Sequence, residues 1–376
     1  MFGRFAFGVL FVCLLASCGG GGRMEEYVVK KYEAGYAEGF EILGAEGRES
    51  SVVVTRTPWQ GADSAAVTRV FVQRDGESVP DGFEGQVVRG EACRIVCMSS
   101  THVALLDAVG AADRVVGVSG IDFVSNRYVQ SKREEIVDVG YDGNIDYERL
   151  VAADADLVLL YGVNGVSGME GKLRELGIPF MYVGEYLEES PLGKAEWMVA
   201  VAEIVGKRQE GVMKFLSIPQ RYNELKVKAA RALVRPKVMI NTPYGDSWLM
   251  ASTESYVARL IRDAGGEYLY TQNDGKQSLP IDMEEAYRLT AEADVWLNVG
   301  QMKTMEELLR LCPKFADTKP VVTGQVWNTI LRATPSGSND YWESGVVQPH
   351  LVLQDLVMLL HPGVVNAEYT YYKRLE

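Results

Sequence analysis

The chain of 376 residues is poor in the side chains that most often bind metals or cross-link a fold, with only three histidines and five cysteines. The histidines His102, His350 and His361 are widely dispersed. Zinc and manganese sites need several imidazole or carboxylate ligands close together. We therefore expect no metal site of the protein's own and no resident cofactor. The cysteines show no paired spacing of the kind that marks a disulfide framework.

Positive charge is also scarce, because 38 Lys and Arg residues face 51 Asp and Glu residues, for a net charge of −13. Nucleic acids bind proteins through clustered cations, so we expect no nucleic-acid partner. The motifs G-x-S-x-G, H-E-x-x-H, G-x-G-x-x-G and G-x-x-x-x-G-K-[ST] are absent too. We do not expect an enzyme, although a Ser-His-Asp site assembled from distant residues around His102 or His350 is an open alternative.

Long hydrophobic runs are missing except at the start of the chain. Residues 5–14 are apolar apart from one glycine, follow Arg4, and are too few for a transmembrane helix. They lead into Leu-Ala-Ser-Cys at residues 15–18, which indicates a signal peptide (1–17) and lipidation of Cys18. A glycine-rich tether (18–23) follows. We expect an exported protein, lipid-anchored to the cell envelope on its periplasmic face. The alternative is an uncleaved apolar anchor with a chance cysteine.

Beyond the tether, hydrophobic patterning divides the chain into four parts. Residues 24–92 contain short β-like runs with no helices between them, which predicts a small β extension. Residues 93–206 alternate apolar runs with helix patterns. Residues 207–232 have a helical pattern in which Pro219 should start a new helix or kink one. In residues 233–376 the alternation resumes, with strands expected at 237–241, 268–270, 295–299 and 321–323.

Continuous apolar strands that alternate with helices indicate parallel sheets covered on both faces. The sequence therefore predicts two α/β lobes joined by a helical segment. The two lobes also share a short sequence pattern. Ile-Asp-Tyr-Glu ends at Glu148 in the first lobe, and Ile-Asp-Met-Glu ends at Glu284 in the second. In both, Asp is a good N-cap and Glu falls in the first helical turn.

Several segments resemble periplasmic binding proteins for siderophores, haem and cobalamin. The resemblance rests on Arg-Ile-Val-Cys-Met-Ser-Ser-Thr-His (94–102), Gly-Ala-Ala-Asp-Arg-Val-Val-Gly-Val (110–118), Val-Gly (139–140), Asp-Tyr-Glu-Arg-Leu (146–150), Asp-Leu-Val-Leu (156–159), Asp-Tyr-Trp-Glu (340–343) and His-Pro (361–362). It covers residues 90–365. It implies two Rossmann-like lobes bridged by a long, rigid helix, in a lipid-anchored receptor that delivers a metal chelate or macrocycle to an ABC importer.

The resemblance further implies that Glu148 and Glu284 dock on arginines of the two permease subunits. Glu285, next to Glu284, leaves open which of the two is used. We expect a monomer. The runner-up function is a surface lipoprotein that scavenges ligand without a transporter.

Open α/β sheets bind ligands at the carboxyl ends of their strands. The residues expected there are Ser100, Thr101, His102, Tyr161, Trp248, Trp327, Tyr341 and Trp342, with Arg127, Lys132 and Arg133 available to an anionic complex. Aromatic walls suit a flat chelate or a macrocycle. His102 is either a metal or haem ligand or a polar residue of a first helical turn.

Overall fold

The structure is a computed structural model that describes residues 22–141, 143–163, 165–245, 247–275 and 277–376. The expected signal peptide and Cys18 lie outside these residues. None of the helices within the described ranges is long and apolar enough to cross a membrane.

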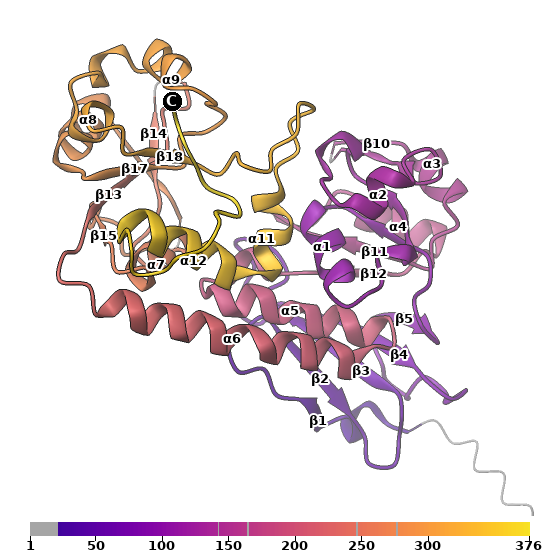
Figure 1. Ribbon diagram of the computed structural model, residues 1–376. Helices are drawn as coiled ribbons and strands as arrows, with labels where there is room; N and C mark the ends of the chain where they lie inside the picture. Colours follow the sequence, from indigo (N-terminus) through magenta and orange to yellow (C-terminus); the bar gives the residue numbers. More distant parts are fainter. Residues whose placement is uncertain (1–21, 142, 164, 246, 276) are drawn as a thin grey trace, which may run out of the picture.

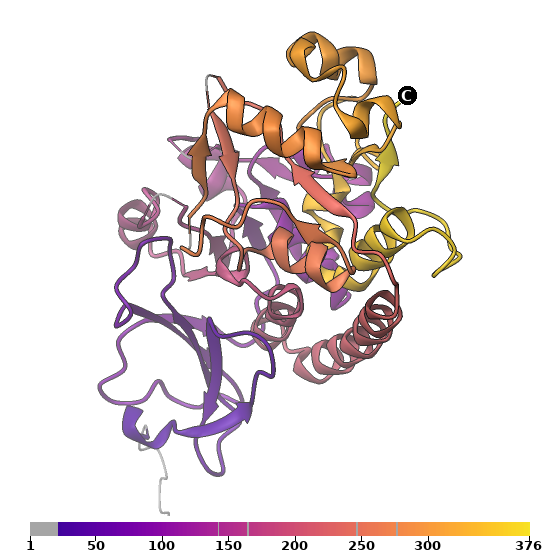
Figure 2. The ribbon, with the colours of Figure 1, turned by 90° about the vertical axis from the view of Figure 1, so that its left-hand side faces the viewer.

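Residues 29–89 form the N-terminal extension, a five-stranded sheet beside the two lobes (Figure 2). Its strands lie in sequence order: β1 (Val29–Tyr32), β2 (Phe40–Gly44), β3 (Ser51–Arg56), β4 (Val67–Gln73) and β5 (Gln86–Arg89). The first four pair antiparallel, and β5 pairs parallel with β4. Alternate residues of β2 are buried, as expected when one face of a sheet packs against protein.

A parallel sheet with the order β12-β11-β6-β7-β8 forms the centre of the N-terminal lobe. The strands are β6 (Ile95–Cys97), β7 (Val115–Val118), β8 (Val137–Asp138), β11 (Leu157–Leu160) and β12 (Phe180–Tyr182). Helices α1 (Ser100–Ala108), α2 (Arg127–Ser131), α3 (Tyr147–Ala152) and α4 (Glu170–Leu176) and a small hairpin, β9 (Gly140–Tyr141) and β10 (Asn144–Ile145), connect them. Every residue of β11 is buried because helices cover both faces of the sheet.

The C-terminal lobe repeats this plan with the order β15-β13-β17-β18-β19, in which only β19 is antiparallel. Its strands are β13 (Lys237–Ile240), β15 (Glu267–Tyr268), β17 (Val295–Leu297), β18 (Val326–Asn328) and β19 (Lys373–Arg374), with a separate hairpin of β14 (Trp248–Met250) and β16 (Leu279–Ile281). Its helices are α7 (Tyr256–Asp263), α8 (Met283–Glu292), α9 (Met305–Leu311), α10 (Lys319–Val322), α11 (Ser344–Val347) and α12 (Pro349–Leu360).

The strand expected at 321–323 is wrong, because Pro320 and the two valines after it belong to α10. Proline near the start of a helix is pre-organised for it, and this local preference prevails over the β propensity of two valines.

Two helices join the lobes. Helix α5 (Pro191–Ile204) is buried nearly throughout, and α6 (Arg208–Ala230) runs along one end of the molecule under both lobes (Figure 1). At about 1.5 Å per residue, the 23 residues of α6 extend for about 35 Å. Pro219 lies inside α6 and does not begin a second helix. The predicted fold of two Rossmann-like lobes bridged by a long helix is confirmed.

Three buried carboxylates attach the extension to α5. Glu196 is fully buried and accepts hydrogen bonds from the Tyr32 hydroxyl (2.6 Å) and from the backbone N–H groups of Gly35, Tyr36 and Ala37 (2.7–2.8 Å). Two turns further along α5, Glu203 accepts from the Ser51 hydroxyl. Just before the helix, Glu188 accepts from the N–H groups of Glu38 and Gly39. These contacts make the extension part of the same packed body as the lobes.

We expect Glu196→Gln to destabilise the protein strongly. The amide would turn a donor toward the backbone N–H groups of residues 35–37, and each buried donor without a partner costs about 1–3 kcal/mol. Urea unfolding should show a loss of at least about 2 kcal/mol. The exposed Glu210→Gln on α6 is the matched control and should stay within about 0.5 kcal/mol of the parent. Equal unfolding midpoints for the parent and Glu196→Gln would show that the carboxylate does not hold the extension.

Candidate functional site

Both lobes have a point at which the strand order changes direction. In the N-terminal lobe the chain passes from β6 to β7 and β8 on one side, then returns to β11 and β12 on the other. In the C-terminal lobe β15 lies on one side of β13, and β17 and β18 lie on the other. Loops diverge at such points and leave a crevice at the carboxyl ends of the strands. The residues that directly follow β6, β11, β13 and β17 therefore lie at these crevices.

At the N-terminal crevice, Ser99 caps α1 by accepting a hydrogen bond from the Thr101 N–H (3.3 Å). Ser100 and Tyr161 are half-buried at this edge, as the sequence suggests. The Thr101 hydroxyl donates to the buried carboxyl of Glu185. His102 is different, because it is fully buried beneath the edge with its ring 6.4 Å from that of Tyr161.

Burial lowers the pKa of His102 to about 3, so the imidazole is neutral at physiological pH. A fully buried ring offers no surface to a ligand. The structure therefore places His102 in the core, in agreement with the interpretation as a helical residue and not as a metal or haem ligand.

The four aromatic residues expected from the C-terminal lobe do not form one wall. Trp248 is fully buried in the core, stacked 5.7 Å from Trp296 and 5.4 Å from Phe315. Tyr341 is also buried, edge-on to Tyr371 and Tyr372. These two expectations are corrected, because both rings pack within the lobe.

Trp327 lies within β18, half-buried, and its ring packs 5.1 Å from that of Tyr369. Trp342 is 59% exposed and is the only one of the four aromatic residues with a largely open ring. A role of Trp327 or Trp342 in ligand binding stays a prediction.

Three exposed aromatic residues that the sequence interpretation missed lie at the carboxyl edges. Phe123 follows β7 and Tyr141 ends β9, with ring centroids 5.9 Å apart and each side chain 50% exposed. Gly120 makes room for this pair, since a Cβ there would lie 2.4 Å from the Tyr141 ring. In the other lobe, Tyr244 follows β13 and is 86% exposed. Their position directly after predicted strands was the available signal.

The main cavity between the lobes has a volume of about 1000 Å³. Its walls come from α1 and α2 of the N-terminal lobe, from residues 332–348 of the C-terminal lobe, and from Lys214 on α6. Six charged residues line it: Asp107, Arg127, Lys214, Arg332, Asp340 and Glu343. None of the eight residues predicted to bind ligand lines this cavity, whereas Arg127, proposed for an anionic complex, does. Lys132 and Arg133 are instead paired with Glu135 and Asp122.

Only some of the charged side chains in this cavity have a partner of opposite charge among the described residues. Arg332 pairs with Asp340 at 3.1 Å. The side chains of Arg127 and Lys214 make no hydrogen bond or ion pair with any residue that the structure describes. The cavity therefore presents two cations that are available to an anionic group.

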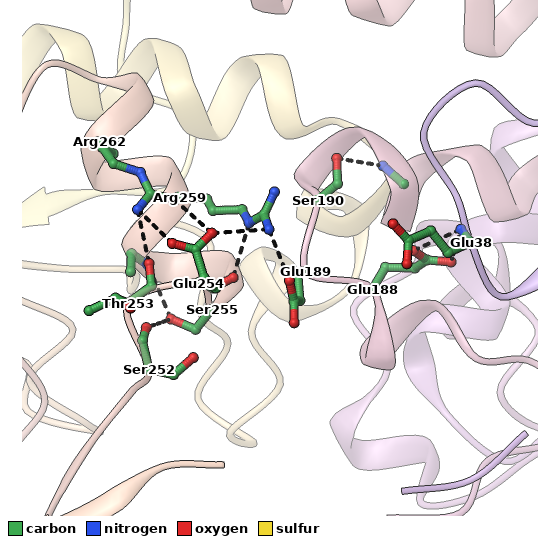
Figure 3. Close-up of polar contacts among 12 residues, drawn as sticks. Glu38, Glu188, Glu189, Ser190, Ser252, Thr253, Glu254, Ser255, Arg259 and Arg262 are labelled. Carbon is green, nitrogen blue, oxygen red and sulfur yellow. Dashed lines mark hydrogen bonds and ion pairs between the residues drawn. The ribbon is translucent and has the colours of Figure 1, made fainter. Parts of the chain in front are cut away.

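The two lobes also contact each other directly. The Ser125 N–H donates to the Glu343 carboxylate at 2.6 Å, and the Ser336 hydroxyl donates to the Asp122 carbonyl at 3.1 Å. Elsewhere, Arg259 on α7 pairs with Glu189, which precedes α5, at 2.9 Å (Figure 3). Neighbouring Glu188 points the other way and holds the backbone of Glu38 in the extension (Figure 3). The segment 188–190 thus contacts both lobes and the extension.

The predicted docking glutamates lie at the helix starts. Asp146 caps α3 and Asp282 caps α8, so Glu148 and Glu284 fall in the first turns. Both side chains are exposed, and neither carboxylate makes a hydrogen bond or ion pair with another described residue. Glu285 is less exposed and pairs with Arg288 at 2.8 Å, which lowers the pKa of its carboxyl. Figure 1 places α3 and α8 at the ends of their lobes that lie away from α6.

A family model described as periplasmic binding protein matches residues 95–329, which is more than half of the chain. The chain therefore belongs to this family of binding proteins. The resemblance that the sequence motifs indicate is confirmed at this level.

Curated relatives include two lipoproteins of Methanocaldococcus jannaschii. MJ0878 is 26% identical over 310 residues, covering 79% of this chain and 71% of the relative. MJ0872 is 25% identical over 345 residues, covering 84% and 82%. Anchoring of the present chain through Cys18 remains a prediction.

Solved structures share the fold. A periplasmic heme-binding protein from Pseudomonas aeruginosa aligns with a TM-score of 0.59 at 16% identity, covering 76% of this chain and 98% of that one. The vitamin B12-binding protein BtuF of Vibrio cholerae aligns with a TM-score of 0.52 at 14% identity, covering 72% and 96%. At these identities the likeness establishes the fold alone.

Glu343 gives the contact between the lobes a pH dependence. Burial, together with nearby Asp340, raises the pKa of this carboxyl to about 8, although the Ser125 N–H opposes the shift. An unfolded Glu titrates near pH 4.3, so the folded chain binds more protons between about pH 4.3 and 8. The contribution of Glu343 to stability should therefore fall as pH rises through this window.

The free energy of unfolding of the parent minus that of Glu343→Gln should fall from pH 5 to pH 8. A difference for Glu343→Gln that rises with pH would show that the carboxyl is ionised in the folded protein.

Proposed function

We propose that the protein is the receptor of an ABC importer, which captures a metal chelate or macrocycle between its lobes. Haem, a ferric siderophore and a corrinoid are the ligand classes under consideration. The observation that carries the proposal is the cavity of about 1000 Å³, bordered by both lobes and α6, in a chain of the periplasmic binding protein family.

Size and charge both support such a ligand. Pockets for small molecules and cofactors span about 300–1,000 Å³, so this cavity has the volume for a large one. Arg127 and Lys214 are available to the carboxylates that haem and many ferric chelates carry. Arg is particularly suited to bidentate pairing with a carboxylate. The exposed rings of Phe123, Tyr141 and Tyr244 offer flat apolar surface at the nearby strand ends.

Docking on the permease would use Glu148 and Glu284. Both carboxylates are exposed and have no partner among the described residues, whereas Glu285 already pairs with Arg288. We therefore assign the docking role in the second lobe to Glu284. Exposed ion pairs are individually weak, at about 0–1 kcal/mol, so the two glutamates would set the orientation of the receptor more than its affinity.

Uptake and ligand affinity measured in the same variants test the proposal. Glu148→Arg and Glu284→Arg, alone and together, should reduce uptake through the cognate permease because they repel the arginines expected on it. Ligand affinity should stay within about twofold, and stability within about 0.5 kcal/mol, since both side chains are exposed. Glu285→Gln is the matched control and should leave uptake unchanged.

Two results would contradict parts of this proposal. Full uptake by the double Glu→Arg variant would remove the docking role and favour a scavenging lipoprotein that acts without a transporter. If hemin, cyanocobalamin and ferric siderophores all fail to bind the parent protein in calorimetry, the capture of such ligands would be refuted.

A further inference from the structure

The β3–β4 loop of the extension, residues 57–66, reaches the carboxyl edge of the N-terminal lobe. We propose that Trp59 and Gln60 of this loop are positioning residues for the ligand cleft, because they fix the residues that follow β11. This inference rests on the proposed function, since it concerns the affinity for the ligand proposed there. It gives the extension a part in ligand binding.

The loop binds Gly162, which follows Tyr161 after the end of β11. The Gly162 carbonyl accepts hydrogen bonds from the Gln60 N–H (2.8 Å) and the Tyr186 hydroxyl (2.9 Å). The Gly162 N–H donates to the same Tyr186 oxygen (3.2 Å). One backbone unit thus joins the extension, the end of β11 and the segment after β12.

The approach at this point is close enough to require glycine. A Cβ on Gly162 would lie 2.6 Å from the Trp59 Cβ and 2.3 Å from the Gly165 carbonyl oxygen. Both distances are shorter than any ordinary contact. The backbones of the extension and of the cleft edge therefore pack directly against each other.

Trp59 of the same loop packs on the N-terminal lobe. Its ring lies edge-on to Tyr182, at the end of β12, with centroids 5.4 Å apart. The Tyr182 hydroxyl in turn accepts a hydrogen bond from the Ser167 N–H (3.0 Å) and donates to Glu170 (3.1 Å). Residues 162–167 are therefore contacted at both ends. Gln60 binds Gly162 at one end, and Trp59 packs on Tyr182, which binds Ser167 at the other.

The loop is itself held in place at its base. The Thr55 hydroxyl, at the end of β3, donates to the Tyr182 carbonyl (2.9 Å). The extension is also attached to α5 through the buried Glu196. Because the loop is held by these contacts, it can restrict the motion of residues 161–163.

These contacts matter for the cleft because of the tyrosines that they fix. The rings of Tyr161 and Tyr186 lie 6.4 Å apart. Tyr161 directly follows β11, at the carboxyl edge of the N-terminal sheet, where open α/β sheets bind ligands. Affinity depends on how much of a site is already ordered before binding. Loosening Gly162 would let Tyr161 and Tyr186 depart from the arrangement that meets the ligand.

The experiment compares Trp59→Leu with Phe83→Leu in the full chain. Both variants replace an aromatic ring of the extension with leucine. Phe83 packs on Phe71, 5.7 Å away, within the extension's own core and not on the lobe. Hemin and cyanocobalamin are titrated by calorimetry, and hydrogen exchange is followed in peptides that cover residues 157–163.

We expect Trp59→Leu to weaken binding of whichever probe the parent binds by about fivefold or more, which is the lower end of typical coupling between sites. Exchange at residues 157–163 should rise in this variant alone. Phe83→Leu should bind as the parent does. A merely structural role for Trp59 would lower the melting temperature of both variants without separating their affinities.

Equal affinity for the parent and Trp59→Leu would overturn the inference, and so would equal weakening by both variants. If the parent binds neither probe, capture of these two ligands fails while the inference stays testable. Faster exchange at residues 157–163 in Trp59→Leu alone would then support the positioning role, and unchanged exchange would overturn it.

Discussion

The architecture depends on the buried carboxylate of Glu196. A carboxylate without water must be saturated by donors, because an unpaired buried charge costs several kcal/mol. Here the donors are the Tyr32 hydroxyl and three consecutive N–H groups of residues 35–37, which lie 159–164 positions away in the sequence. The helix that carries Glu196 also packs against α1, α6 and α11. Together with Glu188 and Glu203, this side chain attaches the extension to α5, a helix that contacts elements of both lobes.

A second constraint follows from the length and packing of α6. This helix packs on α5 and on α12 of the C-terminal lobe, so the distance between the lobes is set by a rigid element. Direct polar contacts between the lobes include the hydrogen bond from Ser125 to Glu343 and the ion pair of Arg259 with Glu189, the second of which Figure 3 shows. The cavity lies against the first of these contacts.

The sequence predicted the fold better than the site. The apolar runs of β6 and β11 and the paired Ile-Asp-x-Glu segments locate the lobes and their exposed glutamates, because they are local patterns. Trp248 and Tyr341 were misplaced because an aromatic residue has the same sequence signature in a cleft wall and in a core. Arg127 was found, whereas Lys214 was missed because the bridging helix carries no motif. The partners of Glu196 lie far away in the sequence and have no local pattern.

The central claim is that this chain carries a metal chelate or macrocycle between its lobes. The most direct measurement is the absorption spectrum and mass of the compound that co-purifies with the protein from its native membranes. Haem, corrinoids and ferric siderophores absorb differently, so one preparation separates them. The account predicts one such compound per chain. It should be absent from the purified variant in which Arg127 and Lys214 are both replaced by Glu. A protein that carries none of these compounds, and takes up none when incubated with all three classes, would contradict it.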